Sequence, residues 1–142
     1  MRFSMTQEYL LSISGLSKFF PVSSQGLFNT KQQLRAVDNV SLNIKAGQTL
    51  GIVGESGCGK STLAKTIARL YEATSGDIYF KDENLTQLNQ KQLRPLRPKI
   101  QYVFQDPYES LNPRHTIGSI LEEPFVIHTT LGPQDRQEKV KQ

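Results

Sequence analysis

A short glycine-rich stretch in the first half of this chain leaves few choices for the fold around it. The stretch fits the pattern G-x-x-x-x-G-K-[ST] and consists of Gly54, Glu55, Ser56, Gly57, Cys58, Gly59, Lys60, Ser61 and Thr62. Glycines let the backbone adopt positive φ and approach a ligand closely, so that successive N–H groups point into one anion-binding hollow. We expect a helix to begin near Lys60 and to add its free N–H groups and positive dipole end. The stretch therefore predicts a nucleotide-phosphate site, in which Lys60 reaches the β- and γ-phosphates and Ser61 holds the bridging Mg²⁺.

A chance match to this pattern is the alternative, and the flanking residues weigh against it. Residues 49–53 form a short apolar run that predicts a buried strand, and residues 62–71 predict an amphipathic helix. Leu63, Ile67 and Leu70 would share one side of that helix. A strand, a glycine loop and a helix in this order are the context that the pattern requires.

The composition is that of a globular domain, or of part of a larger one. The chain has 142 residues, 37% of them hydrophobic, and a net charge of +4 from scattered basic residues, which favours a solvated surface over a nucleic-acid footprint. Its single cysteine, Cys58, excludes an internal disulfide and is typical of a reducing compartment. We expect Cys58 to be a small filler residue, with a redox role as the alternative. No signal peptide and no apolar run near about 18 residues is present, so we expect a soluble protein or one held at a membrane by a partner.

The remaining patterns predict an α/β fold. Strands are expected at residues 9–16, 40–44, 77–80 and 100–104, with residues 19–21 closing the first strand and an exposed loop at 23–33. Turns are expected at residues 46–48 and 74–76, and a hairpin-like corner at 81–84. A short helix is expected at 89–93, a longer one from Ile117 that stops near Pro124, and a last one with Pro133 in its first turn.

Three segments give the chain a family likeness. They are residues 50–63 around the glycine loop, Ser75-Gly76-Asp77-Ile78, and residues 100–114, which end in Ser-Leu-Asn-Pro-Arg. With these segments the chain resembles the N-terminal half of an ATP-binding cassette (ABC) transporter ATPase domain, in the dipeptide, oligopeptide and nickel importer group. The resemblance implies a P-loop core sheet, a small antiparallel sheet from the N-terminal strands, and the start of a helical subdomain.

The resemblance also implies roles for single residues. Gln105 matches the Q-loop glutamine, which helps to hold Mg²⁺ and the attacking water. Phe19 matches the aromatic residue that stacks on adenine, with Phe20 as the alternative, although the family usually has tyrosine there. The segment 108–114 matches the contact with the coupling helix of a membrane subunit, and a plain surface loop is the alternative reading. The implied cofactors are ATP and Mg²⁺. The implied partners are a second ATP-binding subunit and permease subunits, at the cytoplasmic face of the inner membrane.

Several family motifs are absent from this sequence. No four apolar residues are followed by Asp-Glu, as in a Walker B strand, and the Leu-Ser-Gly-Gly-Gln signature is missing. Leu121-Glu122-Glu123 lacks the context of a buried strand, and His115 and His128 lack that of a switch histidine. We therefore expect a truncated domain that holds phosphates without fast hydrolysis. A non-catalytic nucleotide-binding fragment and a soluble P-loop enzyme such as a kinase are the alternatives, and the segment 105–114 argues against the kinase.

Overall fold

The computed structural model describes residues 9–22, 32–106 and 111–141 of the chain. These residues divide into two compact units, 1–93 and 94–142, and each unit is described by itself. Within the described ranges, no helix combines the length and the apolar character needed to cross a membrane.

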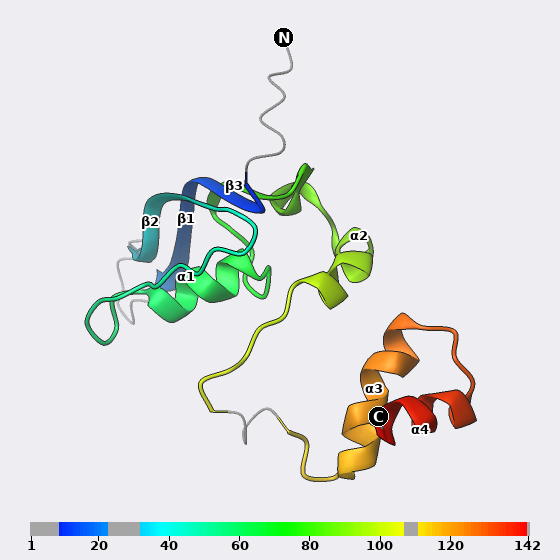
Figure 1. Cartoon of the computed structure of the whole chain (residues 1–142). Coiled ribbons are helices and arrows are strands. Elements are labelled where there is room, and N and C mark those ends of the chain that lie inside the picture. The colour runs from blue at the N-terminus through cyan, green and yellow to red at the C-terminus, as the bar shows by residue number, and fades with distance from the viewer. Residues whose placement is uncertain (1–8, 23–31, 107–110, 142) are drawn as a thin grey trace. The chain divides into compact units, whose positions relative to one another are not determined.

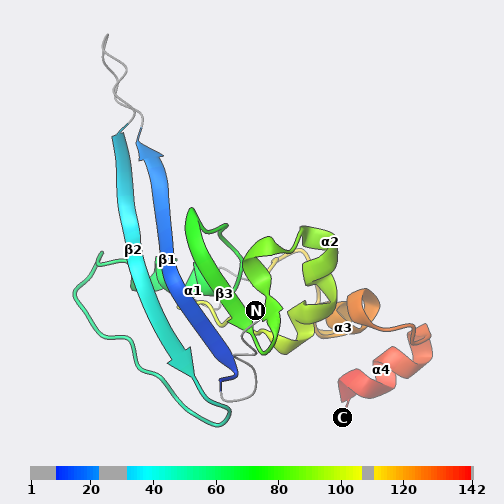
Figure 2. The same cartoon turned by 90° about the horizontal axis from the view of Figure 1, so that it is seen from above.

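The first unit is built on an antiparallel sheet of four strands in the order β2-β1-β3-β4 (Figures 1 and 2). The strands are β1 (Leu11–Val22), β2 (Gln32–Ile44), β3 (Ser75–Phe80) and β4 (Glu83–Asn84). This sheet confirms the strands expected within 9–16, 40–44 and 77–80, and the corner expected at 81–84 joins β3 to β4. A turn at residues 46–48 is also confirmed, with the Gln48 N–H donating to the Lys45 carbonyl at 3.1 Å.

Two expected boundaries of this sheet were wrong. β1 does not close at residues 19–21, because β2 supplies a partner for every one of them and pairing continues to Val22 opposite Gln32. The turn expected at residues 74–76 ends sooner, since Ser75 already pairs with Ser17 of β1. The expected loop at 23–33 lies outside the described residues up to position 31, and Gln32 and Gln33 belong to β2.

Helix α1 (Lys60–Ile67) packs against β1 and β2 and closes the core of the first unit. The helix contributes the buried Leu63 and Thr66. The sheet and the turn that follows it contribute further buried apolar side chains, among them Ile13, Leu16, Val37, Ile78 and Leu85. The helix was expected to run to residue 71 but ends at Ile67. Arg69 has φ of 54°, in the left-handed region, which breaks the helical hydrogen-bond pattern after Ala68.

The two apolar runs at residues 49–53 and 100–104 were predicted as buried strands and are irregular instead. A buried parallel strand needs hydrogen-bonding neighbours on its flanks, and none of the described strands pairs with either run. Most of their side chains are consequently open to solvent, with Val53 95% exposed and Val103 86% exposed, and Ile100 and Tyr102 are partly buried.

Short helical turns end the first unit and begin the second. They are η1 (Leu85–Gln87), α2 (Gln90–Leu93) and η2 (Arg94–Lys99). The Asn84 side chain caps η1 by accepting from the Thr86 N–H at 3.0 Å. α2 confirms the short helix expected at 89–93, and the chain passes directly into η2 at Arg94, the residue before Pro95.

The second unit contains the helix pair α3 (Ile117–His128) and α4 (Pro133–Lys141). Pro133 begins α4, as predicted. α3 was expected to stop near Pro124 but continues for one more turn, with that proline inside the helix. The half-buried Arg136 joins the two helices, donating from Nε to Glu122 at 2.8 Å and from Nη1 to the Leu131 carbonyl at 2.8 Å.

Candidate phosphate-binding site

The glycine loop runs irregularly through residues 51–59 and leads directly into α1. Gly59 is the N-cap of α1 and contributes no side-chain hydrogen bond. The turn closes where the Leu63 N–H donates to the Gly59 carbonyl at 2.8 Å. The N–H groups of Lys60, Ser61 and Thr62 therefore come before the helical hydrogen-bond ladder, where a helix start offers its donors to an anion.

Gly59 has no side chain because the sheet leaves no room for one. A Cβ at this position would lie 2.1 Å from the carbonyl oxygen of Ala36 in β2, and its φ of 97° is in the left-handed region. The contact with Ala36 fixes the start of α1 against the sheet. Gly54 is similarly close to its own loop, since a Cβ there would lie 2.8 Å from Cys58 Sγ.

Lys60 reaches back over the loop instead of extending into solvent. Its ammonium donates to the carbonyl of Gly54 at 2.7 Å and to that of Glu55 at 2.5 Å, and it lies 3.5 Å from Cys58 Sγ. The Cys58 N–H in turn donates to the Glu55 carbonyl at 3.4 Å. The loop thus closes on the Lys60 ammonium through two of its carbonyls, which keeps a full positive charge beside the start of α1.

Ser61 and Thr62 occupy the first turn of α1. Ser61 is exposed, so its hydroxyl is open to an approaching ligand. The Thr62 carbonyl accepts a hydrogen bond from Thr66 Oγ1 at 2.7 Å, which satisfies the hydroxyl of the buried Thr66. Ser61 thus follows Lys60 in the first turn of α1 and is exposed, and its predicted role in holding Mg²⁺ stays a prediction.

The two candidates for the base-stacking role have different neighbours. The Phe19 ring faces the guanidinium of Arg35, whose Cζ is 5.3 Å from the ring centroid. The Phe20 ring meets Tyr71 edge-to-face at 5.5 Å between ring centroids, and the Lys18 ammonium lies 4.9 Å from the Phe20 centroid. The sequence does not point to Arg35 or Lys18, because a single basic residue in a strand gives no signal of an aromatic partner, whether on the neighbouring strand, as for Arg35, or on its own strand, as for Lys18.

Gln105 belongs to the second unit and is exposed in the irregular segment after residues 100–104. Lys60 and Ser61 belong to the first unit, so the joint site of Gln105 with these residues remains a prediction. Of the expected coupling segment 108–114, residues 108–110 lie outside the described residues, and the remaining four are exposed.

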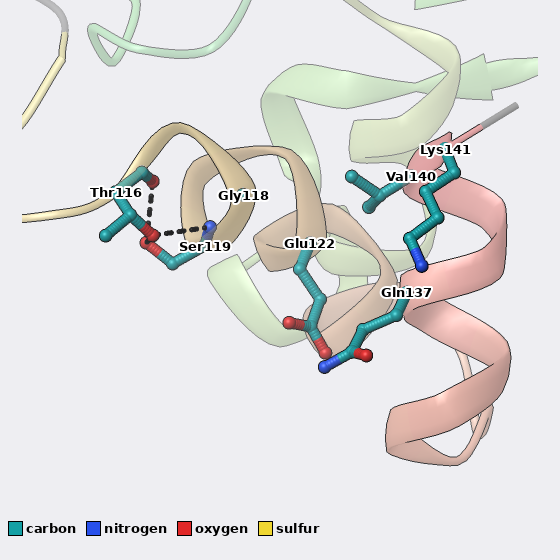
Figure 3. A pocket seen from close by; sticks show the side chains of 7 residues that line it. All are labelled: Thr116, Gly118, Ser119, Glu122, Gln137, Val140 and Lys141. Carbon is teal, nitrogen blue, oxygen red and sulfur yellow. Dashed lines mark hydrogen bonds between the residues drawn. The ribbon is translucent and has the colours of Figure 1, made fainter.

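A hollow of about 370 Å³ lies between α3 and α4, which no sequence motif had indicated (Figure 3). The residues around it are Thr116, Gly118, Ser119, Glu122, Gln137, Val140 and Lys141. Thr116 caps α3 there by accepting from the Ser119 N–H at 3.2 Å, and Glu122 binds Arg136. Thr116 and Glu122 are therefore already engaged in contacts within the helix pair. None of the residues predicted for the phosphate site lines the hollow.

Comparison with known proteins places this loop in a family. The family described as "ABC transporter" matches residues 37–142. The oligopeptide transport ATP-binding protein AppF of Bacillus subtilis is 49% identical over 138 residues, which are 96% of this chain and 42% of that protein. The dipeptide transport ATP-binding protein DppF of Haemophilus influenzae is 50% identical over 131 residues, which are 92% of this chain and 40% of that protein. The chain therefore spans about two fifths of the length of these relatives.

Solved structures agree with the sequence relatives. A dimeric ATP-binding cassette in a post-hydrolysis state, bound to ADP and Pi, matches with a TM-score of 0.77 and 27% identity. The match covers 92% of this chain and 54% of that one. The α/β fold with its small antiparallel sheet is thus that of part of an ATPase cassette, as predicted. The glycine loop, the fold and the relatives agree, and the chain belongs to the ABC transporter family.

Proposed function

We propose that this chain is the N-terminal part of the ATP-binding subunit of a peptide importer, and that its glycine loop binds the triphosphate of ATP. The observation that supports this most directly is the loop itself, closed around the Lys60 ammonium at the start of α1. Relatives named as dipeptide and oligopeptide transport ATP-binding proteins support the solute class. In the complete protein, ATP binding and hydrolysis would drive solute uptake.

The residues of the loop suit a magnesium nucleotide. The free N–H groups at the start of α1 and the Lys60 ammonium would bind the β- and γ-phosphates, where charge grows during phosphoryl transfer. The Ser61 hydroxyl and, from the second unit, Gln105 are oxygen donors of the kind that Mg²⁺ prefers, and when bound that ion would neutralise phosphate charge. Gln105 would also position the attacking water, and Phe19, or alternatively Phe20, would stack on adenine.

Partners follow from the same proposal. A second ATP-binding subunit would supply the signature sequence that this chain lacks, and permease subunits would hold the pair at the cytoplasmic face of the inner membrane. The segment 108–114 would be the contact with a permease. Co-purification of tagged chain with permease subunits would support this placement, and its absence under conditions where the relatives assemble would count against it.

A non-catalytic nucleotide-binding fragment is the second candidate, because the sequence has no Walker B carboxylates. Without a carboxylate to activate water, hydrolysis should be very slow. We expect the purified chain to show no ATP turnover above background in a phosphate-release assay. Turnover that rises with chain concentration and disappears in Lys60→Ala would show that the chain hydrolyses ATP on its own.

The nucleotide site is tested by replacing Lys60. We expect Lys60→Ala to abolish binding of a fluorescent ATP analogue, because the loop loses the ammonium that would bind the phosphates. Lys65→Ala is the matched control, since Lys65 is on the same helix and lies 5.6 Å from the Tyr71 ring centroid. If the unaltered chain and Lys60→Ala bind the fluorescent ATP analogue with equal affinity, as measured by fluorescence anisotropy, the assignment of the nucleotide site to this loop is wrong.

A further inference from the structure

Phe19 and Arg35 form a fixed pair across two strands of the sheet. They are direct partners in the register of β1 and β2, and the Arg35 guanidinium lies 5.3 Å from the Phe19 ring centroid. Arg35 is also held from its own strand, since Nη1 donates to Asp38 Oδ2 at 3.2 Å. The Phe19 backbone is anchored as well, with its N–H donating to Thr74 Oγ1 at 2.9 Å. Ring and cation are therefore positioned by separate contacts.

This pair lies next to the glycine loop. Ala36, which follows Arg35 in β2, is the residue whose carbonyl oxygen touches Gly59 at the start of α1. The strand that carries the guanidinium is thus in direct contact with the junction of the glycine loop and α1 that would bind phosphates. A nucleotide seated in the loop would have its base within reach of this part of the sheet.

We propose that Arg35 is a positioning residue for the nucleobase: it holds one face of the Phe19 ring so that the other face stacks on the base. The proposal rests on the proposed nucleotide site. A cation over one face attracts the π-electrons and fixes the ring orientation, and a planar base then meets a ring that is already ordered. Asp38 pairs with the guanidinium from the same strand, and both side chains are largely exposed, at 68% for Arg35 and 50% for Asp38.

The neighbouring ring offers an internal comparison. Phe20 carries the same kind of contact, with the Lys18 ammonium 4.9 Å from its ring centroid, but its ring is in edge-to-face contact with Tyr71. Removing Lys18 therefore deletes a cation–aromatic pair from the same strand without touching Phe19. Comparison of Arg35→Ala with Lys18→Ala therefore shows which ring, Phe19 or Phe20, stacks on the base.

The test measures two ligands with five variants. Calorimetry with Mg-ATP reports base and phosphates together, and calorimetry with magnesium tripolyphosphate reports the phosphates alone. We expect Arg35→Ala to weaken Mg-ATP binding by about three- to ten-fold and tripolyphosphate binding by less than about two-fold. Arg35→Lys should recover part of the loss, and Lys18→Ala should change neither ligand. Arg35→Ala added to Phe19→Ala should cause no further loss, because both act through one ring.

Each other outcome overturns the proposal in its own way. An equal loss for both ligands would assign Arg35 to the phosphates or to the fold. A loss of Mg-ATP affinity in Lys18→Ala but not in Arg35→Ala would make Phe20 the platform. Unchanged Mg-ATP affinity in Arg35→Ala would show that Arg35 does not position the Phe19 ring for the base. If the unaltered chain binds neither ligand, the nucleotide site itself fails, and the role of Arg35 fails with it.

Discussion

Gly59 is the residue at which loop, helix and sheet meet, and its missing side chain is what allows them to meet. Its φ of 97° is one that other residues adopt only under strain, and the Ala36 carbonyl occupies the place of a Cβ. Gly57 shares the positive φ, at 82°, but has open space around it. Gly51 has neither constraint. Substitutions at the three glycines can therefore distinguish the effect of backbone strain from the effect of steric contact.

Gly59→Ala should accordingly loosen the start of α1 more than either other change. We expect hydrogen exchange of the α1 amides to become about ten-fold faster or more, because strain and steric conflict add at this position. Gly57→Ala should give a smaller increase, from strain alone, and Gly51→Ala almost none. Similar exchange rates in all three variants would mean that the contact with Ala36 does not hold the helix.

Among the elements, those built by local chemistry could be predicted and those that need distant partners could not. The glycine loop, the start of α1 at Lys60, the hairpin corner before β4 and Pro133 at the start of α4 follow from short-range rules, and the structure confirms them. The runs at 49–53 and 100–104 have the composition of buried strands but lack pairing partners among the described strands. The Phe19–Arg35 contact depends on strand register, which composition does not specify.

Pro124 gives an element-scale prediction for α3. A proline inside a helix removes one N–H donor and crowds the carbonyl four residues earlier, here that of Ile120, at a cost of up to about 3 kcal/mol. Pro124→Ala should therefore slow hydrogen exchange in α3 and increase helical circular dichroism. Pro133→Ala is the control, because the first helical position needs no N–H partner, and it should change little. Faster exchange in Pro124→Ala would show that the proline ring packs favourably where it lies.

For the whole molecule, exposed apolar side chains predict poor stability and self-association of the isolated chain. Val53 and Val103 are 95% and 86% exposed, in the two runs that lack strand partners. Light scattering should show association that grows with concentration, and heating should give no cooperative melt of a soluble monomer. Val53→Lys with Val103→Lys should reduce the scattering, whereas Gln33→Lys with Gln101→Lys adds the same charge at exposed polar positions and should reduce it less. A monomeric chain with a sharp melt would contradict this expectation.

The proposed function depends on the glycine loop binding a triphosphate, and titration calorimetry of Mg-ATP into the chain tests this most directly. The titration is carried out at low temperature on a sample whose circular dichroism shows folded helix and sheet. We predict a saturable heat of binding that is lost in Lys60→Ala. A folded sample that gives no heat of association with Mg-ATP would contradict the nucleotide site and the transport function proposed from it.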